Sequence, residues 1–315
     1  MNGRYIVRRL GQSVVVLFGV TIIVFIMIHL LPGGPARAIL GPHARPEQIH
    51  QFNLENGYNL PLYRQYLRYL AELVRGNLGF SYHENQTVTA LLAQNLPKTA
   101  LLVGGAYLIA LVIAIPLGIM QAVKRNRAVD HVITGVSFVA YSMPAFWLGF
   151  LLIMLFGVSL KWLPVSAPQG NFTYILTHPE GMILPVATLA TGTVAWFSRY
   201  TRSSAAEQLI LDYIRTARAK GASQRQVLLY HLPRNCLTPV ITLVGLSLPT
   251  VIAGAVVTET VFNYPGMGLL FWNAATAQDY PVLMGCTIVV GAATVFGNLI
   301  ADLLYARIDP RVRYS

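Results

Sequence analysis

The sequence predicts an all-α integral membrane protein with six transmembrane helices, from its composition, its long apolar segments and the placement of its basic residues. Of 315 residues, 55% are hydrophobic and only 11% are charged, with a mean hydropathy of +0.54. A soluble domain carries roughly 25% charged residues, so this chain has too few to cover a surface that faces water. The abundance of apolar residues also excludes an intrinsically disordered chain.

The first predicted span covers residues 10–31 and follows a short basic N-terminal segment, residues 1–9. The span contains neither Lys nor Arg and has about the 20 residues that a bilayer requires. A secretory signal peptide has a shorter apolar region of roughly 7–15 residues and a small-residue cleavage site, and this run has no such site. We therefore expect an uncleaved transmembrane helix.

Residues 32–98 form the one sizeable segment that we expect outside the bilayer on the outer side. Within it, residues 61–75 have helical amphipathic spacing, with Tyr66 on the apolar face and Arg68 and Glu72 on the polar face. Such a helix either lies on the bilayer surface or caps the bundle, or it offers a docking surface to an outer partner protein. Both interpretations stay open.

Five further spans make up the predicted transmembrane core, residues 99–305. Lys or Arg at the centre of a spanning helix costs about 2.5–3.5 kcal/mol, so segments that lack both residues delimit the spans. The expected helices are about 99–121, 131–158, 181–199, 237–260 and 282–305. The last two share one long stretch without Lys or Arg, which breakers containing Pro and Gly divide.

The basic residues set the predicted orientation, because cytoplasmic loops of membrane proteins carry an excess of Lys and Arg. With the N-terminus inside, 16 of the 23 Lys and Arg residues fall in inner segments, including the loop 200–236 and the C-terminal segment 306–315. Six of the other seven lie in the long outer segment, where the rule has little force. The net charge of +11 is therefore a topology signal rather than a sign of nucleic-acid binding, and both termini are expected in the cytoplasm.

The inner loop contains a short helix-forming stretch. Asp212 can cap this helix or lie near its start, and Gly221 is expected to end it. Tyr213, Ala217 and Gly221 recur at a spacing of four residues and form a small, smooth ridge. The cations beside this ridge are Arg215, Arg218 and Lys220. Such a ridge suits insertion into a groove of another protein, whereas a plain basic loop would only fix the topology.

A few residues within the predicted spans are candidates for a functional role. Ser142-Met143-Pro144 lies inside the third span, where a proline removes a backbone hydrogen bond and gives a kink that tolerates hinge motion. Glu259 lies near the outer end of the fifth span, and Asp302 lies toward the inner end of the sixth. An intramembrane carboxylate is a functional candidate by default. Near a helix end, however, hydration or a hydrogen bond to a neighbouring helix explains it equally well.

Motifs for catalysis and cofactor binding are absent from the sequence. It contains no G-x-x-x-x-G-K-[ST] for nucleotide phosphates, no H-E-x-x-H, no G-x-S-x-G and no His, Asp or Glu cluster at metal-ligand spacing. The two cysteines, Cys236 and Cys286, lie in or beside apolar runs and show no metal spacing. We expect no catalytic residue, no bound metal and no cofactor in this chain.

Segments along nearly the whole chain resemble, in order, the permease subunits of bacterial ABC importers. Residues 212–223, together with HLPRN at 231–235, resemble the EAA loop of that family. The other matching segments are IHLLPG (28–33), PEQI (46–49), GNLG (76–79), PAFWLG (144–149), WLPVS (162–166), GAVVTETVF (254–262), YPGMG (264–268) and DLLYA (302–306). More narrowly, the chain resembles the first of the two permeases in the dipeptide/oligopeptide/nickel group.

The chain departs from the family pattern at a few positions. Arg215-Thr216-Ala217 stands where the general motif has Glu-Ala-Ala, as is usual in the peptide branch. Asn77 stands where we expect Asp in the segment Gly-Asp-Leu-Gly, and Leu232-Pro233 replaces Ala-Leu before Arg-Asn.

The resemblance implies the type I ABC importer permease fold in the bacterial cytoplasmic membrane. It also implies four kinds of partner: the bilayer, a second homologous permease, two cytoplasmic ATPases that bind ATP and Mg, and an extracytoplasmic solute-binding protein. On this basis residues 212–223 form a coupling helix seated in an ATPase groove. The residues expected in that contact are Asp212, Tyr213, Arg215, Thr216, Ala217, Arg218, Lys220, Gly221, Ala222 and Ser223. The candidates for the translocation path or for gating are Ser142, Met143, Pro144, Glu259 and Asp302.

The cargo implied by the resemblance is a di- or oligopeptide. The same machinery importing nickel chelates, glutathione or another small solute is the alternative. A stand-alone secondary carrier or channel is the alternative from another class. Six spans without an inverted repeat, and few buried charges for ion coupling, disfavour it.

Overall fold

The computed structural model describes the backbone of residues 3–31, 33–41 and 43–308, and the side chains of these residues apart from 3–7, 248–249, 252–253 and 301–308. This part of the chain is mostly helical, with one short hairpin in which β1 (Phe80–Ser81) pairs antiparallel with β2 (Gln86–Thr87). The longest helices are α1 (Gly3–His29), α5 (Val88–Val123), α9 (Ile183–Leu209) and α16 (Tyr280–Ile308).

Shorter helices connect the long ones. Before α5 lie α2 (Gly34–Leu40), α3 (Pro46–Asn56) and α4 (Leu62–Val74). Between α5 and α9 lie α6 (Ala128–Ser142), α7 (Ala145–Leu152), the π-helical turn η1 (Ile153–Ser159), α8 (Phe172–Thr177) and the 3-10 turn η2 (Pro179–Met182). After α9 come α10 (Asp212–Ala219), α11 (Gln224–Gln226), the π-helical turn η3 (Val227–His231), α12 (Pro233–Cys236), α13 (Thr238–Ala253), α14 (Val256–Val261) and α15 (Met267–Ala277).

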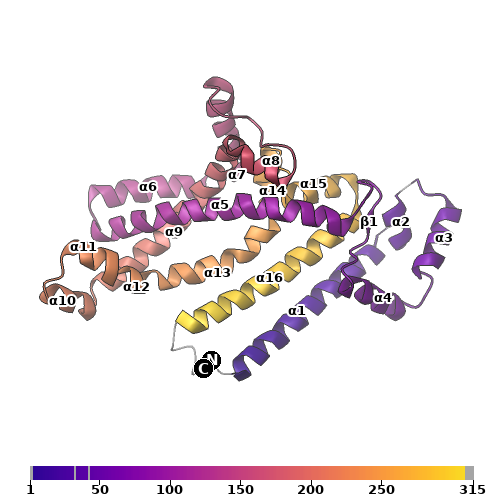
Figure 1. Cartoon of the computed structure of the whole chain (residues 1–315), viewed down its shortest axis with the longest axis horizontal. Helices are drawn as coiled ribbons and strands as arrows, with labels where there is room; N and C mark the ends of the chain where they lie inside the picture. Colours follow the sequence, from indigo (N-terminus) through magenta and orange to yellow (C-terminus); the bar gives the residue numbers. More distant parts are fainter. Residues whose placement is uncertain (1–2, 32, 42, 309–315) are drawn as a thin grey trace.

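The molecule is elongated and its two ends differ (Figure 1). One end carries α10 and α11, and the other carries α2, α3, α4, β1 and α15. The long helices run between these ends. An arrangement of this kind separates one group of polar connections from the other by roughly the length of a membrane-spanning helix.

The helical membrane class predicted from the sequence is confirmed, whereas the number of six spans stays a prediction. Within the described residues, four helices are long and apolar enough to cross a membrane: Arg8–His29, Val88–Val123, Pro179–Leu209 and Tyr280–Ile300. The bent pair formed by α6 with α7 and η1 adds a fifth if it counts as one span. The predicted fifth span contains α13, and the part of it whose side chains are described without interruption, Thr238–Ser247, is a shorter apolar helix.

The structure corrects two of the predicted spans, which are not single helices. The segment 131–158 breaks between Ser142 and Ala145, and its two halves meet at 101°. Pro144 has no amide hydrogen and disfavours the helical conformation at Met143, whose φ and ψ are −77° and 123°. The segment 237–260 breaks at Gly254, which has a φ of +85° and separates α13 from α14.

Helices α5 and α9 form the centre of the fold and run in the same direction. Small, buried residues recur every four positions along α5 and let the two backbones approach closely. They are Ala106, Ala110, Ala114, Gly118 and Ala122. The facing residues follow the same order along α9, with Ala190 beside Ala106 and Ala205 beside Ala122. A Cβ added at Gly118 would lie 2.6 Å from the Thr201 Cβ and 2.7 Å from the Ser198 carbonyl oxygen.

A buried ion pair joins α6 to the same face of α9. The Arg202 guanidinium donates two hydrogen bonds of 2.7 Å to the two oxygens of Asp130. The amide of Asn126 donates to Asp130 at 3.0 Å, which ties the turn between α5 and α6 to this pair. A bidentate, hydrogen-bonded pair of this kind holds its partners in one geometry. The α5–α6 turn is therefore held against the final turns of α9.

Replacing Gly118 with Ala is expected to lower the free energy of unfolding by about 1–3 kcal/mol, because the new methyl group would overlap the backbone of α9. The melting temperature of the purified protein in detergent measures this effect. Gly105→Ala is the matched control on the same helix, since a Cβ there meets nothing within 4 Å. If the Gly118→Ala protein had the same melting temperature as the control, this result would contradict the close approach of α5 and α9.

Candidate functional site

Helix α10 lies just beyond the end of α9, at one extreme of the molecule (Figure 1). Leu211 is extended at its start, and Asp212 falls in its first turn. At its other end Gly221 has a φ of +85°, a conformation that glycine adopts without strain. The amides of Gly221 and Ala222 donate to the carbonyls of Arg218 and Ala217, at 3.0 and 3.1 Å. These two bonds are the Schellman termination of a helix, so Gly221 ends α10 as its sequence position predicts.

The outward face of α10 differs from the ridge predicted from the sequence. Ala217 is 8% exposed and Ile214 is fully buried, on the side where α10 packs against η3. Tyr213 is half-buried and donates to the Gln208 side chain at 3.1 Å. The ridge of Tyr213, Ala217 and Gly221 therefore does not form one exposed face, because Ile214 and Ala217 supply the apolar stripe that holds α10 on its own chain.

The exposed surface around α10 is basic and partly apolar. Its polar residues are Asp212, Arg215, Thr216, Arg218 and Lys220, all exposed. Large apolar side chains lie exposed in the flanking segments: Ile210, Leu211, Leu229 and Tyr230. We call these nine residues the α10 surface. Apolar side chains grouped with charges in this way are typical of a protein-binding surface.

Ser223 and Ala222, also predicted as contact residues, connect α10 to α11. The Ser223 hydroxyl accepts from the Gln226 amide at 3.3 Å, and the Ser223 amide donates to the Gln226 side chain at 2.8 Å. This reciprocal pair is a capping box, which fixes the start of α11. Ser223 therefore orders the turn behind the α10 surface.

Glu259 lies in α14, fully buried, and its carboxylate accepts four hydrogen bonds. One oxygen accepts from the amides of Gly268 and Leu269 at the start of α15, at 2.7 and 3.1 Å. The other oxygen accepts from the Thr99 hydroxyl of α5 at 3.0 Å and from the Ala255 amide at 3.3 Å. An anion at a helix N-terminus is favoured by the free amides and the helix dipole. Glu259 therefore joins α14 and α5 to the first turn of α15.

The glycines of the YPGMG segment make room for this carboxylate. A Cβ on Gly266 would lie 2.5 Å from one Glu259 oxygen, and a Cβ on Gly268 would lie 2.7 Å from the Val256 backbone. Thr99 completes the cap, because its hydroxyl accepts from the Met267 amide at 2.7 Å. The first three amides of α15 are thus all satisfied by side chains.

The other residues singled out within the spans lie apart from Glu259. Ser142, Met143 and Pro144 form the bend between α6 and α7, where Ser142 and Pro144 are exposed. Asp302 lies outside the residues whose side chains the structure describes. No group of three His, Cys, Asp or Glu side chains in the described residues could hold a metal ion.

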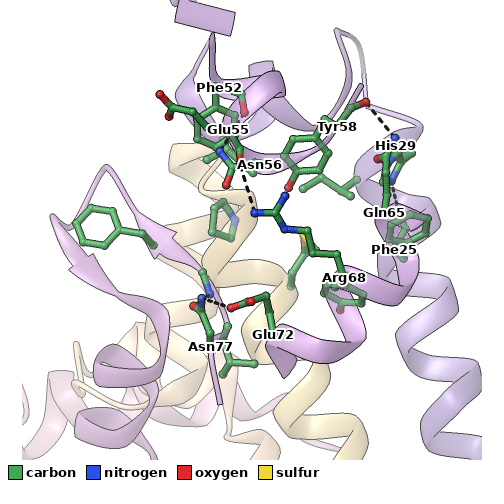
Figure 2. Close-up of a pocket in the computed structure, with 18 of the residues that line it drawn as sticks. Phe25, His29, Phe52, Glu55, Asn56, Tyr58, Gln65, Arg68, Glu72 and Asn77 are labelled. Atoms are coloured by element: carbon green, nitrogen blue, oxygen red, sulfur yellow. Dashed lines mark hydrogen bonds between the residues drawn. The ribbon is translucent and has the colours of Figure 1, made fainter. Parts of the chain in front are cut away.

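A cavity of about 420 Å³ lies at the opposite end of the molecule from α10, between α1, α3, α4, the hairpin and α16 (Figure 2). The Arg68 guanidinium of α4 points into it and donates to the Glu55 carbonyl at 3.2 Å. His29 at the end of α1 bonds to the Gln65 side chain at 2.8 Å, which fastens α4 to α1. The sequence predicted an amphipathic helix here but not the cavity, since residues from segments far apart in the chain enclose it.

Asn77, which departs from the family pattern, has a clear local function in this cavity. Its side-chain amide donates to Glu72 at 2.8 Å, and this bond holds the pKa of the Glu72 carboxyl below its usual value. Aspartate at position 77 would place a second carboxylate against Glu72. The amide is therefore the compatible side chain beside this glutamate.

Two family models together match nearly all of the chain. Residues 114–314 match the model described as "Binding-protein-dependent transport system inner membrane component". Residues 2–103 match the N-terminal model of the same transport-system membrane component.

Curated relatives align from end to end with this chain. The oligopeptide transport system permease protein AppB of Bacillus subtilis is 41% identical over 98% of this chain and 99% of its own length. The di/tripeptide transport system permease protein DppB of Pseudomonas aeruginosa is 39% identical, and the dipeptide transport system permease protein DppB of Escherichia coli is 36% identical. Each of these two alignments covers 99% of both chains. A solved inward-facing structure of the MetNI methionine ABC transporter shares the fold, with a TM-score of 0.54 at 15% identity over 70% of this chain and 96% of that chain.

Replacing Glu259 with Gln is expected to lower the free energy of unfolding by about 2–4 kcal/mol. The side-chain NH2 of Gln would face N–H or O–H donors where a carboxylate oxygen now accepts their hydrogen bonds. Thermal melting in detergent, followed by near-UV circular dichroism, measures the change. Glu180→Gln is the control, since Glu180 is exposed in η2. Equal melting temperatures for the two variants would show that the four bonds to Glu259 do not hold α14, α15 and α5 together.

Proposed function

The chain belongs to the family of binding-protein-dependent transport system inner membrane components, and we propose that it forms half of the translocation pathway of an ATP-driven importer of di- and oligopeptides. It is a multi-pass permease of the bacterial cytoplasmic membrane. The observation that carries the cargo assignment is the end-to-end match to three relatives named as peptide permeases, at 36–41% identity. Because these alignments cover nearly the whole chain, they include both the segment 32–98 and the α10 surface.

In the proposed topology the chain crosses the bilayer six times and both termini are cytoplasmic. The bent pair of α6 and α7 then counts as one span and α13 as another, beside the four long apolar helices. The basic residues support this orientation, because the end of the molecule with α10 carries Arg215, Arg218, Lys220 and Arg225. The cavity lined by Arg68 then faces outward.

The proposed partners are a second homologous permease, two cytoplasmic ATPase subunits and an extracytoplasmic solute-binding protein. ATP and Mg are bound and hydrolysed in the ATPases, and this chain contributes no catalytic residue. Residues 212–223 form the contact with one ATPase. The exposed cations and apolar side chains of the α10 surface support this assignment, since they suit an acidic-rimmed groove on a partner protein.

Movement of the ATPase is proposed to reach the membrane through α9. This helix is continuous from Ile183 to Leu209, about 40 Å at 1.5 Å per residue. It is packed along α5 by small residues and fastened to α6 by the pair of Asp130 and Arg202. A displacement at α10 therefore shifts α5, α6 and α9 together, as alternation between inward- and outward-facing states requires.

Charge reversal at Arg215 and Arg218 is expected to remove ATPase binding and ATP-driven uptake while leaving the fold intact, because both side chains are exposed. The measurement is co-purification of the ATPases with the tagged permease pair, followed by uptake of labelled dipeptide into proteoliposomes that contain ATP and the binding protein. The matched control reverses Arg125 and Arg127, which are exposed in the turn between α5 and α6.

The double variant is expected to retain less than about a tenth of the wild-type uptake, whereas the control retains most of it. Uptake by the permease in the absence of any ATPase would overturn the assignment and indicate a stand-alone carrier. Full uptake by the double variant would place the ATPase contact elsewhere on the chain.

A further inference from the structure

A small polar cavity opens between α5, α6 and α9, toward the inner half of the bundle in the proposed topology. Its volume is about 210 Å³, and its polar lining comes from Gln121, Thr134, Ser137, Tyr141, Ser198, Arg199 and Arg202. The inference drawn from it rests on the proposed function, because the cavity is interpreted as part of the translocation pathway. The volume suffices for one charged group with its neighbouring atoms.

The two arginines of this cavity differ in their charge partners. Arg202 is neutralised by its bidentate pair with Asp130. Arg199 has no carboxylate partner in the part of the chain that the structure describes, and its guanidinium lies 5.5 and 5.8 Å from the ring centroids of Tyr141 and Tyr200. Its side chain is exposed in the single chain, so a ligand can reach it, and an unpaired cation within a spanning segment marks a substrate or ion pathway. Of the two arginines in this cavity, Arg199 is therefore the one whose guanidinium has no negatively charged partner among the described residues.

The position of the Arg199 guanidinium argues against a simple anchor at the inner membrane surface. Helix α6 starts at the turn that carries Arg125 and Arg127, and Asp130 lies in its first turn. Tyr141 lies about three helical turns farther along α6. The Arg199 guanidinium contacts the Tyr141 ring and thus extends away from that turn, whereas a snorkelling arginine extends toward the nearer interface.

Gln121 supplies a second unsatisfied group. It is 2% exposed, and its side-chain nitrogen donates to the Thr134 hydroxyl at 3.2 Å. Its side-chain oxygen is buried and has no hydrogen-bond partner within the described residues. A buried acceptor without a donor is unfavourable by about 1–3 kcal/mol unless a ligand or water supplies the bond. The cavity is thus lined by an arginine whose guanidinium lacks an anion and by a glutamine whose buried amide oxygen lacks a donor.

We propose that this cavity is a subsite of the translocation pathway that receives the C-terminal end of a peptide, with the terminal carboxylate on Arg199 and a peptide N–H on Gln121. A terminal carboxylate with its neighbouring amide carries both groups that the cavity lacks. A phosphate or a simple carboxylic acid supplies the anion but no N–H donor. The aromatic ring of Tyr141 supports the guanidinium from one side and leaves its edge free for a bidentate bond.

The test uses the assembled complex of both permeases and both ATPases in nanodiscs, without the binding protein. Binding of radiolabelled dialanine is measured by equilibrium dialysis, with unlabelled dialanine and dialanine amide as competitors. In the wild type the amide is expected to compete at least about tenfold more weakly than dialanine, because it lacks the carboxylate. Arg199→Gln is expected to bring the two competitors within about twofold of each other, and Arg199→Lys to keep part of the difference. Arg125→Gln, the matched control in the exposed turn, is expected to behave as wild type.

Several results would overturn the proposal. These are undetectable binding of dialanine to the wild type, equal competition by the amide, or an undiminished difference in Arg199→Gln. Loss of the second permease from purified Arg199→Gln would instead place this residue in an interface between permeases. Strong inhibition of dialanine binding in nanodiscs that contain phosphatidylglycerol, compared with nanodiscs of phosphatidylcholine alone, would assign the site to a lipid headgroup.

ATP-driven uptake of dialanine by the wild type is measured in parallel. Its absence would count against the proposed function, whereas uptake combined with any result above would count against this subsite alone.

Discussion

The close approach of α5 and α9 is the constraint on which the rest of the structure depends. Five small residues at a spacing of four bring the two backbones together, and at Gly118 they leave no room for a methyl group. Between spanning helices in a bilayer the hydrophobic effect supplies no net attraction, so close packing of small residues must hold the pair. The cavity beside Arg199 and the base of α10 are both built on this pair.

Two buried carboxylates secure the neighbouring elements, one near each end of this pair. Asp130 holds the start of α6 against α9 through Arg202, whereas Glu259 holds α14 and α15 against the outer part of α5 through Thr99. Both carboxylates have all their partners within the chain. The segments that resemble family motifs around Glu259 therefore have a structural explanation here: the glutamate caps a helix, and two glycines make space for it.

Composition and charge placement predicted the helical membrane class, and the glycine at position 221 predicted the end of α10. Three other features could not be read in full from a local pattern. Ala217 faces inward because η3 lies beneath α10. The kink predicted at Pro144 is a break at which the two halves of the third span meet at 101°. Glu259 accepts from amides nine and ten residues ahead of it. The close packing of α5, by contrast, does have a local signature, because small residues recur every four positions from Ala106 to Ala122. The unpaired state of Arg199 could be recognised only after Asp130 had been assigned to Arg202.

The central claim is that α10 and α9 move as one body when the ATPases act. A pair of spin labels at exposed positions, Glu180→Cys in η2 and Ala219→Cys at the end of α10, brackets the whole of α9. Both native cysteines are buried, which favours selective labelling of the introduced pair. Double electron–electron resonance on the full complex should give the same distance distribution, within about 2 Å, with and without trapped ATP, since a continuous, packed helix does not flex by more. A shift of about 5 Å or more on trapping ATP would show that α10 swings on its junction with α9, and would contradict the proposed transmission.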